Sequence, residues 1–87
     1  MKADKKKISR LLKTAKGQID GILKMVEDDR YCIDISNQLM ATEALIRKTN
    51  KEILHAHIES CVKESFEKDD PKEKIEEIIT IIDKLSK

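Results

Sequence analysis

The most chemically distinctive residues in this sequence are two cysteines and a histidine. His57 and Cys61 are four positions apart, so on a helix their side chains project from the same face, about 6 Å apart. Imidazole and thiolate groups at this spacing form a chelating pair for a soft or borderline metal ion. A histidine and a cysteine on one helix face are also common as ordinary packing residues, so the pair alone leaves both interpretations open.

Cys32 strengthens the metal interpretation because it belongs to the same stripe of a long predicted helix. It precedes His57 by 25 positions, about 37 Å along a helix, so the three side chains cannot meet within one chain. Two antiparallel copies of the helix would bring Cys32 of one copy beside His57 and Cys61 of the other. A twofold axis would then cross near Leu45 and Ile46, and each dimer would contain two sites.

Two thiolates and one imidazole favour a soft ion. Cu(I) accepts three ligands in a trigonal arrangement, whereas Zn(II) would want a fourth ligand or a water molecule. Nickel or cobalt would prefer more nitrogen and oxygen donors. The other histidine, His55, points about 200° away from His57 around the helix and is expected to be a solvent-exposed imidazole. Cu(I) is therefore the predicted cofactor.

Three helices would position these residues. The first is predicted from about Asp4 to Glu27, with apolar residues that recur every three or four positions at Ile8, Leu12, Ala15, Ile19, Ile22 and Val26. Gly17 and Gly21 lie inside it, and their expected compensation is the close approach of another backbone. Asp28-Asp29-Arg30 breaks the pattern. No glycine or proline then interrupts residues 31–66, which predicts one helix of roughly 35 residues.

The third helix has the clearest predicted start. Asp70 as N-cap, Pro71 in the first turn and Glu73 after it form a capping-box-like sequence. This helix is expected to bury one apolar stripe, which Ile81 widens, made of Ile75, Ile78, Ile79, Ile82 and Leu85.

Composition agrees with an all-α fold. Of the 87 residues, 40% are charged and 2% aromatic, with two glycines and one proline, as is typical of long, charge-covered helices. The length indicates a single domain over residues 1–87. A core of this size is marginal alone, so an oligomer is expected to complete it.

The net charge of +1 is unevenly distributed. Residues 1–24 carry eight basic and two acidic side chains, which indicates a localised patch for a polyanion. No apolar run approaches the roughly 18 residues that a membrane span needs, and no signal-peptide stretch follows the basic N-terminus. We therefore expect a cytoplasmic protein without a membrane partner, in which both cysteines are reduced.

Two segments, GQIDGILKMVEDDRYCIDISNQ and LHAHIESC, carry a resemblance to a known family. With the spacing of Cys32, His57 and Cys61, they resemble the copper-sensing operon repressors of the CsoR family, which also includes nickel/cobalt, formaldehyde and persulfide sensors. The similarity runs from about Arg10 to Cys61, with a compatible third helix.

The resemblance implies an all-α subunit with a long central helix, an antiparallel helical dimer, and a homotetramer formed as a dimer of dimers. It implies a transcriptional repressor that binds operator DNA as the apo form and releases it on binding Cu(I). Cys32 of one subunit would join His57 and Cys61 of the other as metal ligands. Tyr31 and Glu77 would form hydrogen bonds around the metal-binding histidine.

No helix-turn-helix, zinc finger or aromatic stacking surface is apparent in the sequence. By family position, the resemblance assigns DNA contacts to Lys16, Lys48 and Lys51, followed by Arg10 and Arg47. Many relatives carry arginine where this chain has Thr14, and this chain lacks the additional N-terminal histidine that nickel/cobalt members use. Such charges on one helix often mark only a solvated face, but across a tetramer they would track phosphates.

Other interpretations stay open at this point. A persulfide or thiol sensor would use Cys32 and Cys61 as a redox pair and would not need His57, and a nickel/cobalt sensor would share the same fold. A helical metal-storage or interaction module would have no DNA role. An enzyme is not expected, because the sequence shows no nucleophile–base–acid set and no phosphate-binding loop.

Overall fold

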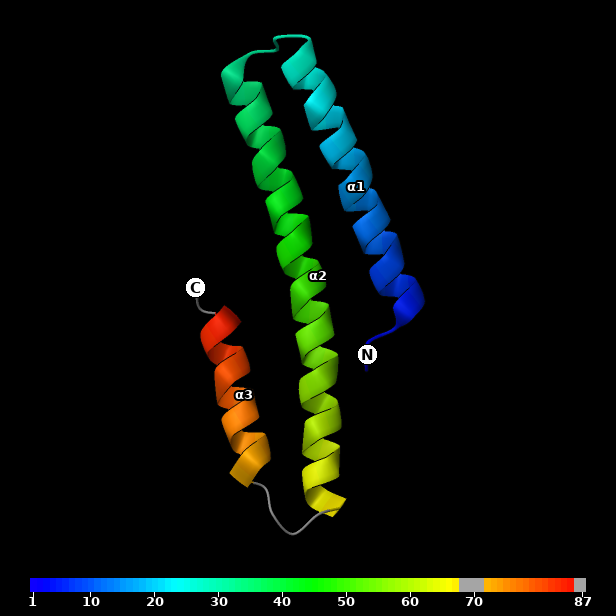
Figure 1. Ribbon diagram of the computed structural model, residues 1–87, viewed down its shortest axis with the longest axis vertical. Coiled ribbons are helices and arrows are strands. Elements are labelled where there is room, and N and C mark those ends of the chain that lie inside the picture. The colour runs from blue at the N-terminus through cyan, green and yellow to red at the C-terminus, as the bar shows by residue number, and fades with distance from the viewer. Residues whose placement is uncertain (68–71, 86–87) are drawn as a thin grey trace. The chain divides into compact units, whose positions relative to one another are not determined.

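The structure is a computed structural model that describes residues 1–67 and 72–85, which contain three helices (Figure 1). Helix α1 spans Lys5–Glu27, α2 spans Cys32–Glu67 and α3 spans Lys72–Leu85. These bounds confirm the predicted all-α fold with a long central helix. The predicted cap at Asp70 and Pro71 lies outside the described residues. None of the helices, as far as they are described, combines the length and apolar character that crossing a membrane requires.

Local sequence accounts for both ends of α1. The Asp4 carboxylate accepts hydrogen bonds from the backbone N–H groups of Lys6 (3.0 Å) and Lys7 (3.4 Å), as an N-cap does. At the other end Asp29 adopts a left-handed conformation with φ of 51°. The N–H of Asp29 then bonds to the carbonyl of Val26, and the N–H of Arg30 to that of Met25. This pattern satisfies the last carbonyls of α1, and aspartate tolerates the left-handed region well enough to replace glycine.

The chain forms two compact units, and α2 contributes to both. The N-terminal unit is Asp4–Asn50, which contains α1 and the first part of α2. The C-terminal unit is Met1–Ala3 with Lys51–Lys87, which contains the rest of α2 and α3. The single domain predicted over residues 1–87 stays a prediction.

In the N-terminal unit α1 packs along α2 through half of its predicted stripe. Ile8, Ala15 and Ile22 are buried, whereas the alternate positions of the stripe are 44–55% exposed: Leu12, Ile19 and Val26. On α2 the buried positions are two threonines. The Thr42 hydroxyl lies 2.8 Å from Gln18 Oε1, and the Thr49 hydroxyl donates to the carbonyl of Leu45. Much of the apolar surface of α1 is therefore left uncovered within one chain.

In the C-terminal unit α3 packs against α2 through a face that differs from the prediction. Ile81 is buried, and Ile78 and Leu85 are partly buried. The expected burial of three other isoleucines was wrong, because more than half of each is exposed: Ile75, Ile79 and Ile82. The reason is that Lys74 and Glu77 lie on the packed face, and the exposed row lies about a third of a turn away from it.

Within one chain nothing packs on the two helical glycines, so the expected close approach of another backbone stays a prediction for a second copy. A Cβ atom added to Gly17 or Gly21 would meet no other atom within 4 Å. Both residues are exposed, and among the described residues no backbone beyond the neighbouring turns of α1 approaches them.

We therefore predict that Gly17→Ala and Gly21→Ala each raise the free energy of unfolding by roughly 0.5–1 kcal/mol, because alanine favours the helix and meets no obstacle. Urea unfolding followed by circular dichroism would measure the change. A loss of stability would instead indicate that a second copy packs closely on this face of α1.

Candidate metal centre

His57 and Cys61 occupy successive turns of α2 in the C-terminal unit, as their spacing predicted. The distance between His57 Nε2 and Cys61 Sγ is 3.5 Å. Cys61 is buried, with 3% of its surface exposed, whereas 38% of the His57 side chain remains exposed. Both cysteines are free thiols. The sulfur is therefore held inside the unit while the imidazole forms the rim of the site.

Glu77 of α3 completes this cluster. Its carboxylate Oε1 forms a short hydrogen bond with His57 Nε2, and its Oε2 lies 3.7 Å from Cys61 Sγ. One nitrogen, one sulfur and one carboxylate oxygen therefore converge, all within 4.8 Å of one another. The same nitrogen of His57 faces both the thiol and the carboxylate, so a metal ion at Nε2 would take the place of this hydrogen bond.

Lys74 borders the cluster on α3. Its Nζ lies 3.4 Å from Glu64 Oε2 on α2 and 3.7 Å from Glu77 Oε2, one helical turn along α3. The hydrogen bond to Glu64 raises the pKa of the Lys74 ammonium group. The hydrogen bond from His57 lowers the pKa of Glu77, with a smaller contribution in the same direction from Lys74. Glu77 is therefore held as a carboxylate at neutral pH.

The environment of Cys61 favours its protonated form. Burial raises the pKa of this thiol, and the nearby negative charge of Glu77 raises it further, whereas Lys74 opposes the shift. A neutral thiol in this position is a weak nucleophile, because the thiolate is the reactive form. A metal ion would have to displace the proton in order to bind sulfur.

Cys32 and Tyr31 lie in the N-terminal unit and do not belong to this cluster. Cys32 is the first residue of α2 and is exposed, and Tyr31 precedes it with 67% of its surface exposed. His55, the other histidine, is exposed and lies 3.0 Å from Glu59, as expected for a surface imidazole. Within the described residues of one chain, the predicted ligands that come together are therefore His57 and Cys61.

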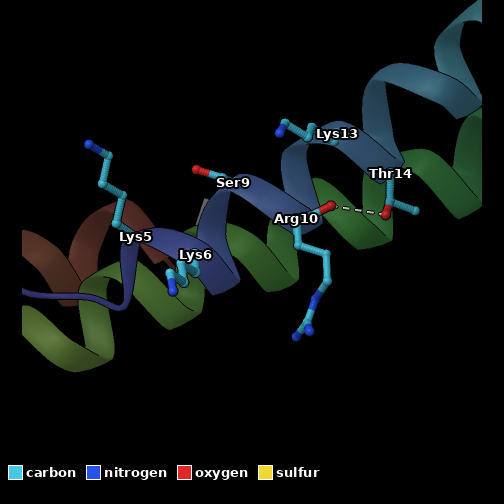
Figure 2. A pocket seen from close by; sticks show the side chains of 6 residues that line it. All are labelled: Lys5, Lys6, Ser9, Arg10, Lys13 and Thr14. Carbon is cyan, nitrogen blue, oxygen red and sulfur yellow. Dashed lines mark hydrogen bonds between the residues drawn. The ribbon is translucent and has the colours of Figure 1, made fainter.

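The basic residues assigned to DNA are all exposed. Arg10 and Lys16 lie on α1, and Arg47, Lys48 and Lys51 lie on α2. Arg47 forms an ion pair of 2.8 Å with Glu43, one turn earlier. Figure 2 shows a shallow pocket on α1, in which Arg10 is joined by side chains that the sequence did not assign: Lys5, Lys6, Ser9, Lys13 and Thr14. The Thr14 hydroxyl donates to the carbonyl of Arg10 at 3.0 Å.

Sequence reasoning from residue spacing did not identify Glu77, which entered only through the family resemblance. It did not identify Lys74 or Glu64 at all. A helical i, i+3 relation links Lys74 to Glu77, but nothing local in the sequence indicates that this charged pair turns inward. The sequence signal that could have indicated this is the distribution of the isoleucines of α3 over more than one face, which leaves room for a charged pair on the packed side.

Comparison with known proteins gives consistent results. The family model for metal-sensitive transcriptional repressors matches residues 4–84. The chain is similar to the copper-sensing transcriptional repressor CsoR of Bacillus subtilis (strain 168), with 34% identity over 84 residues, 97% of this chain and 83% of that protein. It is 46% identical over 50 residues to CsoR of Mycobacterium ulcerans (strain Agy99), which covers 58% of this chain but only 43% of the mycobacterial protein.

Two solved structures share the fold. The copper-sensing repressor CsoR with Cu(I) from Geobacillus thermodenitrificans NG80-2 is 34% identical, with a TM-score of 0.83 over 94% of this chain and 85% of that chain. The nickel-responsive transcriptional regulator InrS has a TM-score of 0.89 over 98% of this chain and 96% of that chain, but at 20% identity it supports the fold alone. Because the family model covers nearly the whole sequence, this chain belongs to the metal-sensitive transcriptional repressor family, a class of regulators rather than enzymes.

Proposed function

We propose that this protein is a Cu(I)-responsive transcriptional repressor that binds operator DNA in the absence of metal and releases it when Cu(I) binds. The observation that supports this most directly is the convergence of His57 Nε2 and Cys61 Sγ, 3.5 Å apart, on one face of α2. Two relatives and one solved structure that match the chain at 34% identity or more are named copper-sensing repressors.

The donor set fits Cu(I). A separation of 3.5 Å allows one ion to bind both atoms, because metal bonds to nitrogen and sulfur are about 2.0–2.3 Å long. With Cys32 from another subunit, the set becomes two sulfurs and one nitrogen, which a soft ion prefers. When bound, Cu(I) would link two subunits through these three side chains.

Exposed apolar residues on α2 support the proposal that a second subunit packs against this helix. Cys32 is followed at intervals of seven by Leu39 and Ile46, which are 51% and 46% exposed, so the three share one helix face. A second α2 running antiparallel would cover this row and place its own Cys32 beside the His57–Cys61 pair. We propose a homodimer of this kind, paired into a homotetramer in the family manner.

In this dimer Tyr31 would accompany Cys32 toward the histidine of the other subunit. Glu77 already holds that imidazole through a hydrogen bond. Carboxylate and hydroxyl partners of this kind orient a histidine ligand and fix its tautomer. We propose that Tyr31 and Glu77 have this role, with Glu77 holding the imidazole in the metal-free state until an ion takes its place at Nε2, and that the loss of this hydrogen bond transmits metal binding to α3.

The DNA-binding surface is proposed from exposed charge. Lys16, Lys48 and Lys51, with Arg10 and Arg47, would contact phosphates, and the basic pocket of Figure 2 extends this surface along α1. Repeated over a symmetric assembly, such contacts would depend on backbone position and DNA shape more than on base reading. A repressor of this kind would act in the cytoplasm.

The thiol-sensor alternative is less well supported. Reactive sensor cysteines are accessible and have a lowered pKa. Cys61 is 3% exposed, and burial raises its pKa. A buried, protonated thiol of this kind is better suited to be a metal ligand than a nucleophile that reacts with a persulfide.

Mixing two inactive variants would test the shared site. Cys32→Ala and Cys61→Ala should each lose at least 100-fold in Cu(I) affinity, because each removes a ligand from every site. In a re-equilibrated equimolar mixture, random pairing in a symmetric dimer leaves about one quarter of the sites intact. Titration against a Cu(I) chelator would measure their number, with His55→Ala as the control that keeps full binding.

The proposal of a site shared between subunits would be wrong if the mixture recovered no high-affinity Cu(I) sites although the subunits had exchanged. X-ray absorption of the bound copper gives an independent check. A site with fewer than two sulfur ligands would contradict the proposed ligand set.

Copper affinity should also rise with pH. Since the pKa of Cys61 is raised, its thiol is protonated at neutral pH and each binding event releases that proton. The affinity should therefore increase by up to about tenfold per pH unit from this group, and level off only above the raised pKa. Chelator competition at several pH values, corrected for the chelator, would measure it. A flat profile would contradict a protonated Cys61.

The proposed DNA contacts can be distinguished from a general effect of the protein's positive charge. Lys48→Ala should weaken apo-protein binding to specific and unrelated DNA alike, and should lower the salt slope by about one for each phosphate that is no longer neutralised. Lys63→Ala, which removes an exposed lysine elsewhere on α2, is the matched control. Fluorescence anisotropy at several salt concentrations would compare them, and equal effects would exclude a specific role for Lys48.

A further inference from the structure

We infer that a cavity between α2, α3 and the residues Met1 and Lys2 is a binding site for a small organic anion, one that has an apolar body and a single acidic group. Aliphatic and aromatic carboxylates and sulfonates belong to this chemical class. The inference goes beyond the proposed function and does not depend on copper, since it rests on lysines and apolar side chains outside the proposed ligand set.

The cavity lies within the C-terminal unit and has a volume of about 410 Å³. Pockets for small organic molecules usually have volumes of about 300–1,000 Å³, so this cavity is at the small end of that range. Residues 1–2, the second half of α2 and one side of α3 form its walls. On α3 the lining residues recur at intervals of three or four and therefore share one helix face: Glu77, Thr80, Ile81 and Lys84.

Apolar side chains form the inner part of the cavity. Ile81 of α3 is buried, and Ile53 and Leu54 of α2 are half-buried. An inorganic ion such as phosphate gains little from these surfaces, because they remove its water and offer no hydrogen bond in return. An apolar ligand body is stabilised by the same contact. The walls therefore favour an organic ligand over an inorganic ion.

Two lysines give the cavity its positive charge. Lys2 and Lys84 both line it and are exposed, and within residues 1–67 and 72–85 neither forms an ion pair. Among the described lining residues the acidic side chain is Glu77, which is already hydrogen-bonded to His57. Two ammonium groups and one carboxylate leave a single net positive charge. A ligand with one negative charge would balance it.

The cavity also borders the candidate metal centre, because Glu77 and His57 are part of its lining. A ligand that packs on this wall meets the pair in its metal-free arrangement, in which the two side chains are hydrogen-bonded to each other. By linkage, any change of ligand affinity on metal binding is matched by an equal change of metal affinity on ligand binding. A small anion in this cavity would therefore modify the response of the metal centre.

Two fluorescent probes of matched shape test this inference on the full-length, metal-free protein under reducing conditions. The probe 8-anilinonaphthalene-1-sulfonate has an aromatic body and one sulfonate, whereas N-phenyl-1-naphthylamine has the same body without the charge. The sulfonate probe should saturate at one site per subunit. Its affinity should fall about three- to fivefold in Lys2→Gln and in Lys84→Gln, because each loses one ammonium group from an exposed rim.

The double variant Lys2→Gln/Lys84→Gln should lose about tenfold or more in affinity for the sulfonate probe, since the two effects add. The uncharged probe should change by less than about twofold in the same variant, because its contacts are apolar. Lys63→Gln, which removes an exposed lysine of the same unit outside the cavity, is the matched control and should bind both probes as the unmodified protein does. Circular dichroism establishes that each variant remains helical.

Nuclear magnetic resonance locates the bound sulfonate probe independently. The backbone amide signals of Ile53 and Leu54 should shift on binding, whereas those of Ile75 and Ile82, in the exposed row of α3, should not. The inference would be overturned if the double variant bound the sulfonate probe as Lys63→Gln does, if both probes lost affinity equally, or if the shifts placed the probe on the exposed row. No copper is present, so none of these outcomes depends on the copper proposal.

Discussion

The hydrogen bond between the Glu77 carboxylate and the His57 imidazole joins α3 to α2 at the candidate metal centre. It places a polar group of α3 beside the His57–Cys61 pair, on the same face of α3 that packs against α2. Ile81 is buried beside it, while a row of isoleucines is left outside. The polar contacts of the candidate metal centre and the buried Ile81 therefore share one face of α3.

This contact also explains where sequence reasoning succeeded and where it did not. The helix bounds and the His57–Cys61 pair follow from local rules, namely capping, the absence of helix breakers and the four-residue repeat. The packed face of α3 does not follow, because isoleucines occupy several of its sides and periodicity cannot choose among them. The face that packs carries Glu77, whose partner His57 lies 20 residues away in the sequence, so local patterns do not reveal the contact.

The glycines of α1 show a second limit. Their positions indicated a close helix contact, yet the space around them is open within one chain. Sequence periodicity reports that a face is apolar or small but not whether the same chain or another copy covers it. The alternate exposed residues of α1 and α2 pose the same question, and the proposed assembly answers it with further copies of the chain.

The hydrogen bond between Thr42 and Gln18 has a consequence for the pairing of α1 with α2. Apolar helix faces tolerate sliding, since one aliphatic contact resembles the next. A shift of α1 by one turn, about 5.4 Å, would separate the Thr42 hydroxyl from Gln18 Oε1 at a position that is only 4% exposed. The Thr42 hydroxyl would keep its hydrogen bond to the carbonyl of Gln38, 3.1 Å away in α2, so the shift would cost the Gln18 contact alone, about 0.5–1.5 kcal/mol. The Thr42–Gln18 hydrogen bond therefore favours one alignment of α1 along α2 over alignments that are shifted by a turn.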